Sequence, residues 1–83
     1  MEKILKTLAN RRRLAILKYL KQNKEAPVAE IASEINLSFK ATSKHIGILS
    51  GADIIEREQR GLQMFYRLSH NQESAVKHII SLI

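Results

Sequence analysis

A run of small polar and basic residues near the middle of the chain has the side chains needed to contact nucleic acid. Residues 38–51 contain no acidic residue. At about 3.6 residues per helical turn, Lys40, Ser43, Lys44 and the small Gly47 fall on one face. Lysines beside short polar side chains can donate hydrogen bonds to phosphates and to base edges in a DNA major groove. The pattern therefore predicts either a DNA-reading helix or an ordinary solvated polar face.

The other side of this segment is apolar. Thr42, Ile46 and Leu49 recur at i, i+4 and i+7, which predicts a buried seam. His45 lies beside that seam, and we expect it to be a hydrogen-bonded structural residue and not a ligand. Ser38 can cap the start of the helix, because its hydroxyl can accept a backbone N–H of the first turn.

The preceding segment reads as a second, shorter helix packed against the first. Its apolar residues follow helical spacing: Val28, Ile31, Ala32 and Ile35. Asn36 then tolerates the left-handed conformation of a tight turn, in which Leu37 is an apolar plug. Two helices joined in this way predict a helix-turn-helix, or in the simpler reading a two-helix corner.

Strand-like sequence follows, and it makes the helix-turn-helix interpretation much more specific. Residues 54–59 and 62–68 are two runs around Arg60-Gly61, where Gly61 can supply the positive φ of a hairpin turn. A hairpin directly after a recognition helix is a wing, which lies along the DNA backbone or enters the minor groove. We expect DNA contacts from helix 38–51 and wing 54–68: Ser38, Phe39, Lys40, Thr42, Ser43, Lys44, Arg57, Arg60 and Gln63.

The remaining elements complete one domain over residues 1–83, mainly α with a small β-hairpin. We expect a helix over residues 2–8, a helix from an Asn10 N-cap to about Gln22, and a linker over 23–26. Further predictions concern single positions: Pro27 as the first residue of its helix, Gly51 or Asp53 in the left-handed conformation, and Asn71 or Ser69 as the cap of a last helix.

Composition limits the possible functions. The 83 residues carry a net charge of +6, and a basic domain of this size favours a polyanionic partner, although lysines also promote solubility. There is no cysteine, which excludes disulfides and thiolate metal sites. No apolar run approaches the about 18 residues of a membrane span, and the N-terminus lacks a signal-peptide core. We expect a cytoplasmic protein that is not an enzyme and needs no cofactor, because no catalytic constellation appears.

Three consecutive arginines occupy the first turn of the second helix, where the helix dipole disfavours cations. Arg11, Arg12 and Arg13 therefore suggest a use such as a phosphate contact or a salt bridge to Glu30 or Glu34. A solvated basic turn is the alternative.

Three stretches resemble the ArsR family of arsenic-repressor-like winged helix-turn-helix regulators. They are LANRRRLAIL at 8–17, LSFKATSKHIGIL at 37–49 with its Ser-x-His core, and FYRL at 65–68. The resemblance implies a homodimeric repressor that binds operator DNA and releases it when an effector binds.

The departures from that family concern metal binding. Pro27 and Ala29 stand where the metal-sensing members have a Cys-x-Cys pair, and they cannot ligate. The last helix offers only His70, Glu73 and His78, fewer donors than zinc requires. We therefore expect no metal effector. Phe39 stands where the family often has Gln, and it contacts a thymine methyl or packs on the turn.

Apolar stripes at both ends of the chain predict a homodimer: Ile4, Leu5, Leu8, Val76, Ile79, Ile80 and Ile83. Two-fold symmetry then predicts an inverted-repeat operator with half-sites about 10 bp apart, or a multiple of that. Alternatively, the last helix folds back over its own core. A winged-helix module whose basic face binds an acidic protein is the second functional hypothesis.

Overall fold

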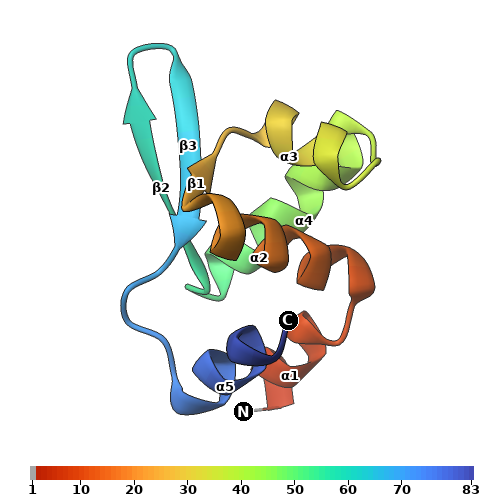
Figure 1. Cartoon of the computed structure of the whole chain (residues 1–83), viewed down its shortest axis with the longest axis vertical. Helices are drawn as coiled ribbons and strands as arrows, with labels where there is room; N and C mark the ends of the chain where they lie inside the picture. The colour runs from red at the N-terminus through yellow and green to blue at the C-terminus, as the bar shows by residue number, and fades with distance from the viewer. Residues whose placement is uncertain (1) are drawn as a thin grey trace.

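The structure, a computed structural model, describes residues 2–83, which form five helices and a three-stranded antiparallel sheet (Figure 1). The elements in chain order are α1 (Glu2–Leu8), α2 (Arg11–Asn23), β1 (Glu25–Ala26), α3 (Val28–Glu34), α4 (Phe39–Gly51), β2 (Ile55–Arg60), β3 (Gln63–Leu68) and α5 (Ser74–Leu82). This order confirms the predicted winged helix-turn-helix fold.

Short polar residues set the helix boundaries as expected. The Asn10 side chain accepts hydrogen bonds from the backbone N–H groups of Arg12 and Arg13, at 2.9 and 3.1 Å. Ser38 Oγ accepts the backbone N–H of Ala41 at 3.1 Å. Asn36 takes the left-handed conformation, with φ of 57°. Local side-chain chemistry therefore fixes the start of α2, the start of α4 and the turn between α3 and α4.

One apolar core joins α2, α3, α4 and the base of the sheet. The predicted seam of α4 is confirmed, since Ile46 and Leu49 are buried together with Thr42. The buried apolar residues are Leu8, Ile16, Leu17, Leu20, Ala26, Ile31, Ala32, Ile46, Leu49, Ile54, Ile55 and Val76. This core holds α4 so that its opposite face points to solvent.

The sheet has the strand order β1-β3-β2. Arg60 pairs with Gln63, so the hairpin turn consists of Gly61 and Leu62. The predicted turn, Arg60-Gly61, is therefore one residue too early. Gly61 has φ of 61° while Leu62 does not have a positive φ, the pattern of a type II′ turn with glycine first.

Residues 23–26 are not simply a linker. Glu25 and Ala26 form β1, which pairs with Arg67 and Tyr66 of β3. The Ala26 side chain is buried in the core. A two-residue strand is too short to show alternation, and its pairing partner lies about forty residues later, so the sequence prediction missed it.

Two smaller predictions are wrong, and a third is confirmed for one of its two alternatives. Pro27 is the N-cap of α3 and not its first helical residue, and Glu73, not Asn71 or Ser69, occupies the N-cap of α5. At the end of α4, Asp53 takes the left-handed conformation with φ of 59°. Asp tolerates this region because its short polar side chain can bond locally, and Gly51 remains helical.

The last helix, α5, packs against α2, at the end of the molecule opposite the wing (Figure 1). Leu8 and Val76 are only 3% and 1% exposed within the single chain, so the prediction that they line a dimer interface is wrong. Lys21 Nζ donates to the backbone oxygens of Ile80 and Ser81, at 3.0 and 3.4 Å, which ties α5 to α2. No helix within residues 2–83 is both long and apolar enough to cross a membrane.

Candidate nucleic-acid interface

Helix α4 presents an exposed face of small and basic side chains. Its exposed residues include Phe39, Lys40, Ser43, Lys44 and Gly47. Neither lysine forms an ion pair with any residue of the described chain. Nothing lies within 4 Å of the position that a Cβ on Gly47 would take. This face can therefore approach a polyanion closely, with both ammonium groups available.

Thr42 does not belong to that face, and its predicted DNA contact is wrong. Its side chain is 0% exposed and packs in the seam with Ile46 and Leu49. The reason is helical geometry, because a residue four positions before Ile46 must share its buried side. Of the two predictions for Thr42, the buried seam and the DNA face, only the first is confirmed.

Phe39 begins α4 and is 60% exposed. More than half of this residue is therefore open to solvent. It remains available for an apolar contact such as a thymine methyl. Ile48 on α4 and Leu62 at the tip of the wing are 40% and 105% exposed. Neither residue was predicted to belong to the interface. Leu62 lies at the tip because the hairpin turn consists of Gly61 and Leu62.

The wing has two chemically different faces, because successive side chains of a strand point to opposite sides. Arg57 and Tyr66 are cross-strand partners on the face toward α4. Between α4 and this face lies an open groove of about 880 Å³. The residues lining it include Ser43, Gly47, Arg57, Tyr66 and the acidic Asp53 and Glu56. Of the predicted wing contacts, Arg57 is the one that shares this groove with α4.

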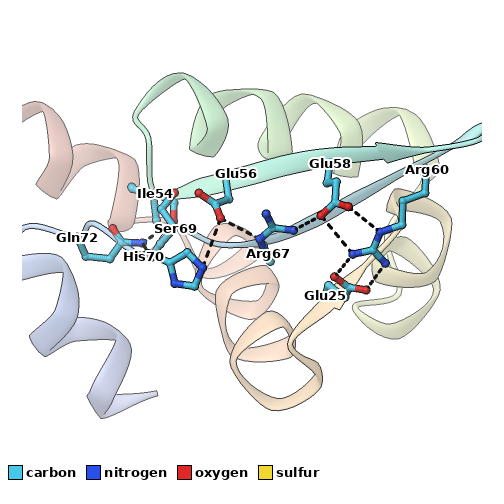
Figure 2. A network of polar contacts seen from close by, with 9 residues as sticks. All are labelled: Glu25, Ile54, Glu56, Glu58, Arg60, Arg67, Ser69, His70 and Gln72. Carbon is cyan, nitrogen blue, oxygen red and sulfur yellow. Dashed lines mark hydrogen bonds and ion pairs between the residues drawn. The ribbon is translucent and has the colours of Figure 1, made fainter.

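The other face of the wing carries a chain of ion pairs (Figure 2). Arg60 Nη1 and Nη2 bind the two carboxylate oxygens of Glu25 at 2.5 and 2.8 Å. Arg60 Nε binds Glu58 at 3.1 Å, and its guanidinium lies 4.6 Å from the centre of the Phe65 ring. Arg60 is thus held by carboxylates on the side away from the groove, and Gln63 is its cross-strand partner.

Arg67 continues this chain toward the base of the wing. Its Nε binds Glu56 at 2.8 Å and its Nη1 binds Glu58 at 2.7 Å. Hydrogen bonds from Arg60 and Arg67 lower the pKa of Glu58 to about 2. A hydrogen bond from Arg60 likewise lowers the pKa of Glu25. We call the set Glu25, Glu56, Glu58, Arg60 and Arg67 the wing ladder.

Arg13, in the first turn of α2, makes two contacts that were not predicted from the sequence. Arg13 Nε donates to the backbone oxygen of Thr7 at 2.5 Å, and its Nη1 lies 3.2 Å from His45 Nδ1. A guanidinium only donates, so this contact requires an unprotonated Nδ1. Burial, followed by the charge of Arg13, lowers the pKa of His45. Arg13 therefore joins α1 to α4, and it forms no salt bridge to Glu30 or Glu34 within the described residues.

Glu30 has a different partner from the one proposed for it. The hydroxyl of Tyr19 donates a hydrogen bond to Glu30. This bond raises the pKa of Tyr19 to about 12. Arg11 is exposed and Arg12 is half-buried, so a phosphate contact by either remains a prediction.

The structure contains no cluster of three or more His, Asp or Glu side chains that could hold a metal ion within residues 2–83. His70 and Glu73 precede the first residue of α5, Ser74, so the prediction that the last helix carries them is wrong. His70 Nε2 instead lies 3.9 Å from a carboxylate oxygen of Glu56.

Known proteins share this arrangement. The family described as "Helix-turn-helix domain" matches residues 8–58. The transcriptional activator HlyU of Vibrio cholerae is 36% identical over 80 residues, which cover 96% of this chain and 70% of HlyU. The structure of reduced HlyU from Vibrio cholerae superposes with a TM-score of 0.82, over 96% of this chain and 80% of that chain.

Two further solved structures have a similar fold at lower identity. One is the homodimeric winged helix-turn-helix DNA-binding domain of Mb0332 from Mycobacterium bovis, described as a possible ArsR-family transcriptional regulator. It is 28% identical with a TM-score of 0.81, covering 98% of this chain and 71% of that chain. The transcriptional repressor PagR of Bacillus anthracis is 28% identical with a TM-score of 0.81, covering 98% and 88%. The chain described here belongs to the helix-turn-helix domain family and is a winged helix-turn-helix transcription regulator of the ArsR type.

Proposed function

We propose that this regulator is a homodimeric repressor that binds an inverted-repeat operator through α4, with the wing alongside. The observation that carries the proposal is the exposed face of α4, where Lys40 and Lys44 have no acidic partner within the described chain. The core buries the other side of α4, so this face is the one available to a major groove.

The side chains of the interface divide by role. Lys40, Ser43 and Lys44 are placed to read base edges or bind the flanking phosphates, and Phe39 is placed for a thymine methyl. Ser38, at the start of α4, can reach a phosphate. From the wing, Arg57 contacts a phosphate beside the groove, and Gln63 reaches the backbone or minor groove near the tip.

Dimerisation would bring two such faces to successive major grooves. Leu5 on α1 and Leu82 on α5 are 46% and 70% exposed, and both helices lie at the end of the molecule away from the wing (Figure 1). Ile4, Ile79, Ile80 and Ile83 are only partly covered by the core. A stable interface needs about 600–800 Å² from each subunit, for which these paired helices are suited. The homodimeric state described for the Mycobacterium bovis relative supports a dimer.

The dimer is tested by sedimentation of the intact chain and of the double variant Leu5→Glu, Leu82→Glu. These exposed positions contribute little to the core of the single chain, so the variant should remain folded and become monomeric. Lys18→Glu, an exposed change on α2, is the matched control and should remain dimeric. An intact chain that is monomeric at tens of micromolar, or a double variant that is still dimeric, argues against the proposed interface.

A protein-binding module is the second candidate, favoured by the exposed apolar side chains of Phe39 and Ile48 on α4. Salt titration of binding to a random DNA duplex separates the two. For DNA, the logarithm of the affinity falls linearly with the logarithm of salt concentration, by about 0.9 per neutralised phosphate. If the intact chain does not bind duplex DNA even at low salt, the DNA interpretation fails.

The direction of regulation and the effector also belong to this proposal. We infer repression from the ArsR resemblance, and a reporter placed behind a selected operator should lose expression when the protein is present. We also propose that the protein acts in the cytoplasm, is not an enzyme, and does not respond to zinc, cadmium or arsenite. A stoichiometric micromolar metal site found by calorimetry, coupled to loss of DNA binding, would contradict the last of these points.

A further inference from the structure

The wing ladder raises the question of what Arg60 does. Its guanidinium makes four hydrogen bonds to carboxylates, two to Glu25 and two to Glu58. An arginine has five N–H donors, so one remains. A DNA phosphate at this position would have to displace two carboxylates and would then lie beside both of them.

The path of the Arg60 side chain gives it a structural purpose. In the register of the sheet, Glu25 pairs with Arg67, which also pairs with Glu56 near the start of β2. Arg60 pairs with Gln63 at the other end of β2. Four residues of a strand span about 13 Å, so the Arg60 side chain must reach back along the wing to meet Glu25. Its position 4.6 Å from the Phe65 ring centre, between those two levels, is consistent with that path.

Backbone pairing alone attaches β1 only weakly to the hairpin of β2 and β3. β1 has two residues and pairs with the base of β3. The distal half of the hairpin therefore has no neighbouring strand. The contact between Glu25 and Arg60 connects that half to β1, and Glu58 and Arg67 extend the connection across β2 and β3 (Figure 2).

We propose that the wing ladder clamps the hairpin to β1, and that Arg60 is a positioning residue that sets where Arg57, on the opposite face, meets the DNA backbone. Isolated surface ion pairs contribute little, but a bidentate arginine–carboxylate pair within a network is the favourable exception. The ladder has three carboxylates and two guanidinium groups, which does not suit it to bind phosphate itself.

This inference rests on the proposed DNA binding and is tested by the salt dependence of duplex affinity. The variants are Arg60→Gln, Glu25→Gln, their combination, and Arg57→Gln as the matched phosphate contact. Arg57→Gln should lower the salt slope by about one. Arg60→Gln should weaken binding by about threefold or more and leave the slope unchanged.

Glu25→Gln gives opposite predictions for a clamp and for a competitor. If Glu25 clamps the wing, its replacement weakens binding by the same factor as Arg60→Gln, although it removes a negative charge, and the double variant is no weaker than either single variant. If Glu25 merely competes with phosphate for Arg60, its replacement tightens binding. The proposal would be overturned if Glu25→Gln bound DNA more tightly than the intact chain. It would also be overturned if Arg60→Gln lowered the salt slope of DNA affinity by about one.

A second measurement does not depend on DNA. Amide hydrogen exchange of residues 57–66 should become faster in Arg60→Gln and in Glu25→Gln, and no faster still in the double variant. Unchanged exchange in both single variants would overturn the clamp. If the intact chain fails to bind DNA while exchange responds as expected, the proposed function fails and the clamp stands.

Discussion

The outer face of α4 and the outer face of the wing each carry two cations, yet they differ in what those cations contact. Lys40 and Lys44 are exposed and have no ionic partner within the described residues, whereas Arg60 and Arg67 are bound by three glutamates. By the number of basic residues alone, the two faces would be equally suited to bind a polyanion. Their pairing differs, because carboxylates neutralise the arginines of the wing while the two lysines of α4 have no ion pair within the described residues.

The difference originates in the local sequence. Residues 38–51 contain no acid, so no helical neighbour can neutralise the two lysines. In the wing, Glu56, Glu58 and Arg60 alternate along one face of β2, where cross-strand neighbours meet. A hairpin with mixed charges on one face therefore tends to satisfy itself, whereas Arg57 on the other face has no ion pair within the described residues.

The largest expected effect is loss of DNA binding from the double change Lys40→Ala, Lys44→Ala. If both side chains contact phosphate, the salt slope should fall by about two, and any lost base contact should cost about 1–3 kcal/mol at one position of the site. Fluorescence anisotropy with a labelled duplex measures both quantities.

Thr42→Val is the matched control on the same helix. The Thr42 hydroxyl is buried, with no hydrogen-bond partner in the described structure, so its removal should leave both DNA affinity and folding intact. Unchanged affinity of the double lysine variant would refute the assignment of this face.

Gly47→Ala is expected to have an intermediate effect, which raises the stability of the fold and lowers the affinity for DNA. Glycine inside a helix is about 0.5–1 kcal/mol less favourable than alanine, and a Cβ at Gly47 meets nothing within 4 Å. The variant should therefore unfold at higher temperature, by circular dichroism. It should also bind DNA less tightly, because the added methyl group lies on the docking face. A stabilised variant with full affinity would show that DNA does not approach α4 at this position.

The smallest effect is a pH dependence of the ladder. The pKa of Glu58 falls from its ordinary 4.5 to about 2 because Arg60 and Arg67 donate hydrogen bonds to it. A lowered carboxylate pKa stabilises the fold above the unfolded-state value and loses that contribution as the pH falls from about 4.5 toward 2. Glu58→Gln should flatten this part of the curve of unfolding free energy against pH. A curve identical to that of the intact chain would mean that the ladder adds no stability.

Sequence reasoning succeeded where the signal is local. The caps at Asn10 and Ser38, the left-handed Asn36 and the seam of Ile46 and Leu49 follow from residues within a few positions of one another. These features are sufficient to place α4 and its exposed face.

It failed where the partner is distant in the chain. Arg60 meets Glu25 across 35 positions, and Arg13 meets His45 across 32. No periodicity connects such residues, since the contacts exist only after β1 joins the sheet and α2 packs against α4. The charges within the hairpin were therefore visible in the sequence, but the contact of Arg60 with Glu25 was not.

The contrast between the two faces can be measured directly by NMR, with ¹⁵N-labelled protein titrated with duplex DNA. We expect backbone shifts across residues 39–47 and a shift of the Arg57 Nε–H signal. The Nε–H signals of Arg60 and Arg67 should remain near their positions in the free protein, because their carboxylate partners stay in place. Large shifts of Arg60 and Arg67, with little change along α4, would contradict the account.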